Sequence, residues 1–291
     1  MTRQHDGSDY GRLIVQGEDR PGIVASVSRV LGEHGANIVS LDQASSDETS
    51  GGRFFQRTVF HLPDLSGKLA DLNQALEKTL VDELGMEFRL VEAKRKKRLA
   101  IFVSKTDHCL LDLLWRHRRG ELPVTISMVV SNHPDLGDEV RRFDIPFFHV
   151  PVEKDRKAEA EKEQLNLLKG NVDLVVLARY MQILSADFLD EVGVPVINIH
   201  HSFLPAFIGA GPYQRAKERG VKLVGATAHY VTEDLDEGPI IEQDVIRVSH
   251  RDSVRDLQRK GADVERLVLA RAVKWHCEDR VIRDGNTTVV F

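Results

Sequence analysis

Residues 194–201 combine a strand pattern with polar side chains that could act on a carbonyl group. The run VPVINI, residues 194–199, is apolar and largely β-branched apart from Asn198, which is typical of a buried strand in a parallel sheet. Because side chains alternate along a strand, Asn198 and His200 should share one face, while His201 should point to the other. The pattern therefore predicts an amide donor beside an imidazole.

A carboxylate follows in the turn after a second apolar run, residues 223–231, which carries His229. That turn, TEDLDEGP, contains Asp236. Open α/β sheets bind ligands at the carboxyl ends of their strands, so we expect Asn198, His200 and Asp236 to converge there. Attack on a carbonyl needs a donor for the oxyanion, a proton shuttle, and a carboxylate that orients the imidazole or the attacking group. These three side chains match those needs in that order.

A purely structural role is the alternative for any single histidine at a strand end. Two polar side chains on one face of an apolar strand favour a functional site, because burying each without a partner would cost about 1–3 kcal/mol.

Three segments of the chain resemble the signature segments of the formyltransferase superfamily that uses 10-formyltetrahydrofolate. They are LARYMQILS (177–185), NIHHSFLP (198–205) and GATAHYVTEDLDEGPIIEQ (225–243). From DRPGI near the start to the closing GNTTVVF, the chain resembles the formyltetrahydrofolate deformylase family. The resemblance implies that Asn198, His200 and Asp236 form the catalytic set. It also implies 10-formyltetrahydrofolate as substrate, no tightly bound cofactor, and a product, formate, that supplies purine synthesis and balances the one-carbon pool.

The resemblance also implies a pterin pocket, in which backbone groups recognise the edges of the ring. The alternative for Met181, Ile183 and Leu184 is that they are core side chains. The residues expected to bind substrate are Met181, Gln182, Ile183, Leu184, His229, Thr232, Glu233, Asp234 and Leu235. Ile208 stands where many relatives carry a basic residue.

Composition restricts the class of protein. The chain has 291 residues, 42% of them hydrophobic, a net charge of −5 and a pI near 6.2, which do not suit nucleic-acid or anionic-membrane binding. The polar first residues and the absence of a long apolar run predict a cytoplasmic protein. Cys109 and Cys277 have no CxxC spacing, so we expect two reduced thiols and no disulfide or metal site.

The first 92 residues predict the element order βαββαβ, with helices over 22–34 and 68–84. This order resembles the ACT regulatory domain, a ferredoxin-like fold. Its first strand-to-helix turn, DRPGI, offers helix N-terminal amides to a carboxylate, so the resemblance implies an amino-acid effector of the glycine or methionine class. Ordinary turn chemistry and subunit packing in a homo-oligomer are the alternatives. The expected effector residues are Asp19, Arg20, Pro21, Gly22 and Ile23.

The basic run AKRKKR, residues 93–98, is interpreted as a linker, and a second domain is expected over 99–291. Strands and helices alternate there, which predicts a mostly parallel, open, Rossmann-like α/β sheet. A long helix over 254–276 and a final hairpin close the chain.

Water is the expected acceptor of the formyl group. The first strand-to-helix turn of the second domain, VSKTDHC, has no glycine, whereas glycinamide ribonucleotide formyltransferases cradle a phosphate there in a glycine-rich turn. Two alternatives stay open: transfer to an amine, and a non-enzymatic amino-acid sensor. A metal hydrolase using His200, His201 and His229 is disfavoured, because adjacent histidines on a strand point apart.

Overall fold

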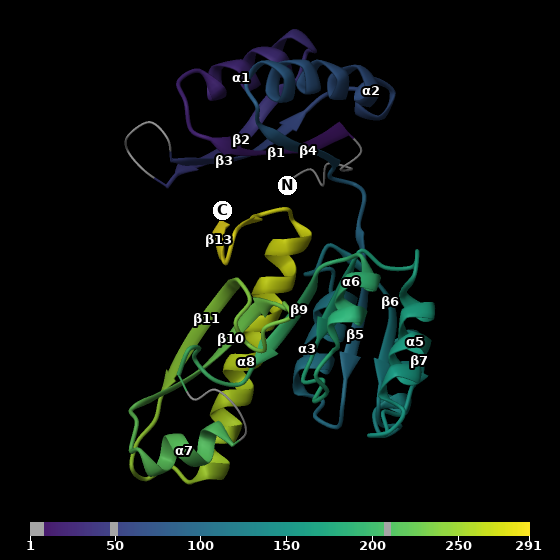
Figure 1. Cartoon of the computed structure of the whole chain (residues 1–291), viewed down its shortest axis with the longest axis vertical. Coiled ribbons are helices and arrows are strands. Elements are labelled where there is room, and N and C mark those ends of the chain that lie inside the picture. Colours follow the sequence, from purple (N-terminus) through teal and green to yellow (C-terminus); the bar gives the residue numbers. More distant parts are fainter. Residues whose placement is uncertain (1–8, 47–51, 207–210) are drawn as a thin grey trace. The chain divides into compact units, whose positions relative to one another are not determined.

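The computed structural model describes residues 9–46, 52–206 and 211–291. It contains two compact units, seen in Figure 1. The first comprises residues 1–96 together with 278–282 and 289–291, and the second comprises 97–277 and 283–288. These bounds differ from the expected ones at two points: strand β5 begins at Lys97, inside the basic run, and two C-terminal pieces belong to the first unit.

The first unit has the expected order βαββαβ. Its four strands form an antiparallel sheet in the order β2-β3-β1-β4. The second helix differs from the prediction, since it starts at Leu65 rather than Lys68 and continues as a π-helix, η2. The elements are β1 (Tyr10–Glu18), α1 (Ile23–Glu33), β2 (Asn37–Ser45), β3 (Arg53–His61), α2 (Leu65–Leu76), η2 (Glu77–Glu83) and β4 (Glu87–Glu92).

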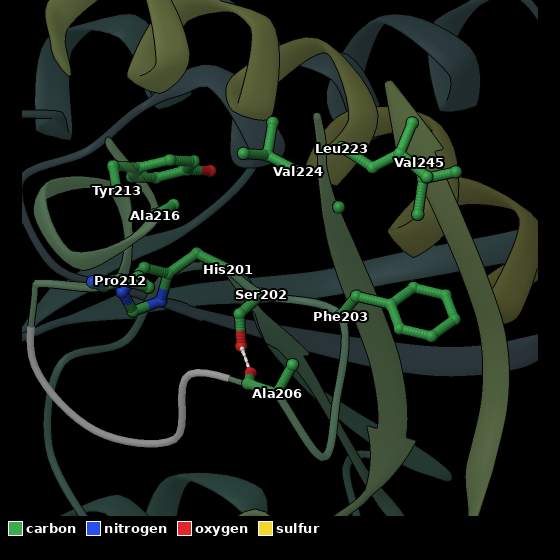
Figure 2. Close-up of a pocket in the computed structure, with 11 residues that line it drawn as sticks. His201, Ser202, Phe203, Ala206, Pro212, Tyr213, Ala216, Leu223, Val224 and Val245 are labelled. Carbon is green, nitrogen blue, oxygen red and sulfur yellow. Dashed lines mark hydrogen bonds between the residues drawn. The ribbon is translucent and has the colours of Figure 1, made fainter. Parts of the chain in front are cut away.

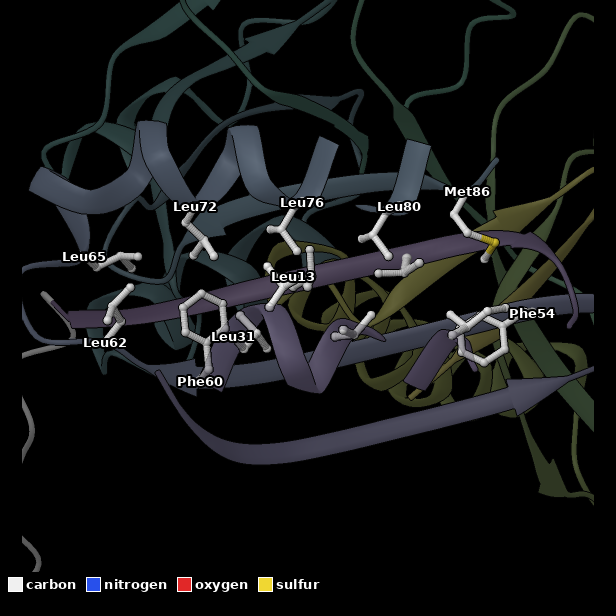
Figure 3. Close-up of a cluster of buried hydrophobic side chains, with 14 residues drawn as sticks. Leu13, Leu31, Phe54, Phe60, Leu62, Leu65, Leu72, Leu76, Leu80 and Met86 are labelled. Atoms are coloured by element: carbon white, nitrogen blue, oxygen red, sulfur yellow. The ribbon is translucent and has the colours of Figure 1, made fainter. Parts of the chain in front are cut away.

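The core of the first unit lies between its helices and one face of its sheet (Figure 3). Leu13 of β1, Leu31 of α1 and Leu72 of α2 are wholly buried in it. The alternation of side chains along β1 sends Ile14 to the opposite face. There it packs in a second, smaller cluster with Phe55, Ile282, Val289 and Phe291. The C-terminal residues thus cover the sheet face that the helices leave open.

The second unit is a seven-stranded sheet in the order β11-β10-β9-β8-β5-β6-β7. The five strands from β9 to β7 are parallel, while β10 and β11 add antiparallel pairs at one edge. This confirms the predicted mostly parallel α/β sheet. The strands are β5 (Lys97–Val103), β6 (Val124–Ser131), β7 (Phe147–His149), β8 (Leu174–Leu177), β9 (Val196–His200), β10 (Leu223–Tyr230) and β11 (Ile240–Arg247).

Helices cover the central strands, whose side chains are buried on both faces. Alternate residues of β5 divide between those faces, and Phe102 packs against Tyr180 and Phe188 in one core cluster. The longest helix, α8, packs against β9, β10 and β11 and against α3. The helices are α3 (His108–Arg118), α4 (Gly137–Arg141), α5 (Lys157–Leu168), α6 (Ala186–Val192), α7 (Pro212–Glu218) and α8 (Val254–Cys277).

One helix, α6, was not predicted, because the chain after β8 was expected to be a loop. Ser185 caps it, with its Oγ accepting from the Phe188 amide at 3.1 Å and donating to Glu161 at 2.6 Å. The predicted C-terminal hairpin forms from β12 (Val281–Asp284) and β13 (Thr287–Val290).

Two further findings concern the class of protein. Cys109 and Cys277 are both buried and form no disulfide, as expected. Among the described residues, no helix combines the length and the apolar character needed to cross a membrane.

Candidate active site

Two antiparallel strands bring Asn198, His200 and His229 together. In the β9–β10 pair, His229 lies opposite Asn198, and Thr227 lies opposite His200. The expected meeting of two carboxyl strand ends is therefore wrong in detail, because these strands run in opposite directions. A register shift between Ala228 and His229 in the β10–β11 pair accompanies this arrangement.

The turn that holds Asp236 depends on one glycine. A Cβ on Gly238 would lie 1.8 Å from the Tyr230 carbonyl oxygen, so only glycine allows this close approach. The amide of Tyr230 donates to the Pro239 carbonyl at 2.9 Å and closes the loop between β10 and β11. Asp236 has a φ of 60°, a left-handed conformation that Asp tolerates better than most residues. The loop thereby turns the carboxylate back toward β9.

Asp236 pairs with the imidazole of His200. Its Oδ1 lies 3.3 Å from His200 Nδ1 and 3.9 Å from His229 Nε2. The side chains of Asp236 and His200 are only 10% and 7% exposed. The hydrogen bond from His200 lowers the pKa of Asp236, and this effect outweighs the burial that would raise it. The carboxylate is therefore ionised at neutral pH.

His229 holds Asn198 in place. Its Nδ1 lies 3.0 Å from the Tyr230 carbonyl oxygen, which can only accept, so Nδ1 carries the proton. Burial lowers the pKa of His229, which favours the neutral ring. Its Nε2 then accepts from Asn198 Nδ2 at 3.2 Å. The second hydrogen of that amide nitrogen stays available to a ligand oxygen.

The second ring nitrogen of His200, Nε2, is placed to exchange a proton with a bound molecule. With Nδ1 directed at Asp236, its Nε2 is buried and makes no hydrogen bond to any residue that the structure describes. An unsatisfied buried imidazole nitrogen is costly to leave without a partner. The geometry suits a group that donates to, or takes a proton from, a bound molecule.

Asn198, His200 and Asp236 all line one cavity of 380 Å³. Every residue expected to bind substrate lines it too, within the segments 181–184 and 229–236. Met181 and Ile183 are 57% and 61% exposed, so they are not core side chains, whereas Leu184 is buried. Exposed apolar residues beside buried polar ones suit a flat heterocycle with polar edges. Ile208 lies outside the described residues.

The segment that carries Met181 is anchored from β5. The hydroxyl of Ser104 accepts from the Met181 amide at 2.9 Å and donates to Asn132 Oδ1 at 2.7 Å. The Ser104 amide donates to the Arg179 carbonyl at 3.3 Å. Ser104 was not singled out in the sequence, although a polar residue that ends an apolar strand was a usable signal.

A buried charged cluster borders the cavity, and the sequence did not reveal it. Glu265 of α8 is 2% exposed and accepts from Tyr213 Oη at 2.8 Å, and His108 Nε2 lies 2.8 Å from its other oxygen. Arg179, which lines the cavity, places Nη1 3.5 Å from that oxygen. Burial alone would raise the pKa of Glu265, but the bond with His108 and the charge of Arg179 lower it to about 2.

Glycine again allows a close contact in this cluster, since a Cβ on Gly261 of α8 would lie 1.9 Å from Tyr213 Oη. His108, Cys109 and Glu265 also lie within 4.8 Å of one another, a spacing that metal ligands can have. Burial raises the pKa of the Cys109 thiol, which disfavours the thiolate that a metal would need.

His201 does not point away from His200 as expected. Strand β9 ends at His200, so the alternation no longer applies, and the two rings lie 5.2 Å apart. Burial and the charge of Arg179 lower the pKa of His201 to about 4. His201 also lines a second cavity of 340 Å³, shown in Figure 2, whose other walls are mostly apolar, among them Phe203, Val224 and Val245.

The predicted effector residues lie at the turn between β1 and α1. Gly22 has a φ of 97° and open space where a Cβ would be, and its carbonyl accepts from Ser26 in the first turn of α1. Asp19 accepts from the Ser45 hydroxyl at 2.6 Å. Among the residues that the structure describes, no side chain caps this helix end, which leaves its first amides without a side-chain acceptor.

Comparison with known proteins gives one family. Residues 97–273 match the formyl transferase model, and residues 11–77 match the ACT domain model. A formyltetrahydrofolate deformylase of Mycobacterium tuberculosis is 61% identical over 284 residues, which cover 98% of this chain and 91% of that protein. The crystal structure of a formyltetrahydrofolate deformylase from Pseudomonas syringae is 47% identical, with a TM-score of 0.92, covering 99% of this chain and 96% of that one.

Glycinamide ribonucleotide transformylase 1 from Symbiobacterium toebii resembles a smaller part, with 30% identity and a TM-score of 0.64 over 67% of this chain and 94% of its own. The full-length similarity, the two matching models and the fold together place this chain in the formyltetrahydrofolate deformylase family.

Proposed function

We propose that this chain hydrolyses 10-formyltetrahydrofolate to formate and tetrahydrofolate in the cavity lined by Asn198, His200 and Asp236. The name of its full-length relatives supports the reaction. The observation that carries the assignment of residues is the state of His200, whose Nδ1 faces Asp236 while its buried Nε2 lacks a described partner. A bound formyl group or water molecule would supply that partner.

The first step is attack by water on the formyl carbon. Asp236 positions the water and accepts its proton, directly or through His200, while a C–O bond forms. Negative charge develops on the formyl oxygen. Asn198 Nδ2 and protonated His200 stabilise that charge by donating hydrogen bonds. The Asn198 amide is oriented for this hydrogen bond before substrate binds, because it also donates to His229.

The second step is collapse of the tetrahedral intermediate. The bond from the formyl carbon to N10 breaks, and the proton taken from water passes to N10. Tetrahydrofolate and formic acid leave, and the acid loses its remaining proton to solvent to give formate. Atoms balance without any other reactant, and no cofactor enters these steps.

The test of this function is formate release from 10-formyltetrahydrofolate with no acceptor added. The wild-type chain should release one formate for each tetrahydrofolate formed. Asn198→Ala, His200→Ala and Asp236→Ala should each lower kcat by about 10²–10³ or more. His149→Ala, at an exposed strand end, is the matched control and should retain full turnover. Near-normal turnover in a folded site variant would remove that residue from the catalytic set.

We further propose that residues 19–23 of the ACT unit bind an amino-acid effector of the glycine or methionine class. The uncapped start of α1 and the open space at Gly22 support this, because free amides at a helix N-terminus favour a carboxylate. Isothermal titration with glycine and methionine tests it. The test variant is Gly22→Val, in which the new side chain would occupy the open space at the turn. It should abolish binding if the effector binds there.

The wider role follows from the reaction. Formate released here would supply purine synthesis and balance the one-carbon pool. A cytoplasmic location and a homo-oligomeric state remain predictions, checked by cell fractionation and by light scattering.

A further inference from the structure

The catalytic cavity has a cationic wall that the hydrolytic mechanism does not use. Segments 181–184 and 232–235 are proposed to bind the pterin, and Asn198, His200 and Asp236 to act on the formyl group. Arg179 remains, lining the same cavity with its side chain 15% exposed. Its Nε and Nη1 are buried without a hydrogen bond to any described residue. A guanidinium therefore borders the cavity that Asn198, His200 and Asp236 also line.

Arg179 is fixed by the protein around it. Glu265 lies 3.5 Å away and is itself held by His108 and Tyr213, each at 2.8 Å. An ionised, almost fully buried carboxylate holds a cation firmly, since moving the cation would leave the carboxylate's charge unpaired. The φ of Arg179 is 65°, a left-handed conformation that disfavours any residue other than glycine. Strain of this kind marks positions that the surrounding structure holds in place.

The cluster of Arg179, Glu265, Tyr213 and His108 also includes a residue at the first strand-to-helix turn of the second unit. His108 begins α3 directly after the turn that lacks glycine, and its ring is tied to Glu265. The transformylase from Symbiobacterium toebii shares this fold, and its name indicates transfer of the formyl group to an amine. In the present chain, Glu265 links the turn at His108 to the wall at Arg179.

We propose that Arg179, positioned by Glu265, is the specificity-determining residue that reserves the formyl group for water. This rests on the proposed function. The guanidinium lines the cavity that would hold the formyl group. It repels the ammonium form in which an amine enters from neutral solution, and so opposes the entry of the amine before it can lose its proton and attack, whereas water is small and uncharged. Transfer to an amine would form a C–N bond at the formyl carbon, break the bond to N10, and move the proton of the amine to N10. Arg179 prevents the approach that this step requires.

Product partition tests the proposal. Substrate carrying a ¹³C-formyl group is incubated with enzyme and excess glycinamide, and formate and N-formylglycinamide are counted by NMR. The wild type should give formate alone above the uncatalysed reaction. Arg179→Gly suits the left-handed backbone, and it should raise the ratio of formylglycinamide to formate about tenfold or more. Arg179→Lys keeps the positive charge and should resemble the wild type.

Arg179→Gln is the second variant, which keeps volume and removes the charge, and it should also form formylglycinamide. An unchanged ratio in folded, active Gly and Gln variants overturns the proposal. Loss of hydrolysis or of fold in both variants also overturns it, because Arg179 would then serve catalysis or folding. Failure of the wild type to release formate without amine counts against the proposed function instead, so the two failures are distinguishable.

Discussion

Asn198 Nδ2 lies 3.2 Å from His229 Nε2 across the antiparallel β9–β10 pair. Because Nδ1 of the same ring faces the Tyr230 carbonyl, the ring accepts from the amide. One strand thus supplies Asn198, the proposed oxyanion donor, and the neighbouring strand orients its amide.

His229→Leu should therefore reduce kcat by about 10-fold to 100-fold while KM changes little, since the lost bond matters most in the transition state. Steady-state kinetics on 10-formyltetrahydrofolate measure this split. His229→Gln can still accept from Asn198 and should recover part of kcat. A rise in KM with kcat intact would instead assign His229 to substrate binding.

Burial of His201 should make the protein less stable in mild acid. Its pKa is about 4 in the folded chain, below its ordinary value of 6.5, so the unfolded chain binds the extra proton first. Stability from this group is complete above pH 6.5 and is lost as pH falls from 6.5 toward 4, by at most about 3 kcal/mol. Urea unfolding of wild type and His201→Gln at pH 7.5 and 4.5 measures the difference.

In that experiment His201→Gln should show the smaller loss of stability on acidification. His149→Gln, an exposed histidine, is the control and should follow the wild type. Equal acid sensitivity of the wild type and His201→Gln would contradict the assignment. Glu265 contributes in the same direction only below pH 4.5, because its pKa is lowered to about 2.

Gly238→Ala should lower both stability and activity. The new Cβ would meet the Tyr230 carbonyl oxygen at 1.8 Å, so the loop must move and carry Asp236 with it. We expect a loss of about 1–3 kcal/mol of unfolding free energy, as for other overpacked sites, and a lower kcat. Gly32→Ala is the paired control, because it lies in α1 with open space around it and should stabilise the protein by about 1 kcal/mol.

Asp279 should be the most sensitive charged residue of the first unit. Its wholly buried carboxylate pairs with Arg12 at 3.1 Å and Arg89 at 2.8 Å, and Arg57 donates to its carbonyl. Asp279→Asn keeps the shape and tolerates the φ of 54°, yet should cost about 3–5 kcal/mol by leaving buried arginine charge without its counterion. Thermal unfolding measures it. Glu159→Gln, from an exposed pair with Arg156, should change stability by less than about 1 kcal/mol.

The spacing of apolar and polar residues along the chain predicted much of the fold, and the polar residues that interrupt apolar strands indicated the cavity. The alternation along β9 correctly grouped Asn198 with His200, because period-2 geometry needs no tertiary information. The antiparallel direction of β10 was not readable in the same way. It depends on the pairing of β10 with β9 in the folded sheet, which local periodicity does not encode.

Arg179 and Glu265 were missed for a different reason. They lie 86 positions apart, and each alone resembles an ordinary charged residue on a strand end or a helix face. Only the folded chain buries them together, and the unusual φ of Arg179 is invisible to composition. Helix α6 was missed because seven residues carry too little periodicity to separate from a loop.

Residues 278–282 and 289–291 belong to the first unit, and this affects the order in which that unit can fold during synthesis. Ile14 and Phe55 are synthesised before the second unit, but Ile282 and Phe291, which pack in the same cluster, are synthesised after most of it. During synthesis, the apolar face formed by residues of the first 96 positions therefore stays uncovered until residues 97–277 have been made.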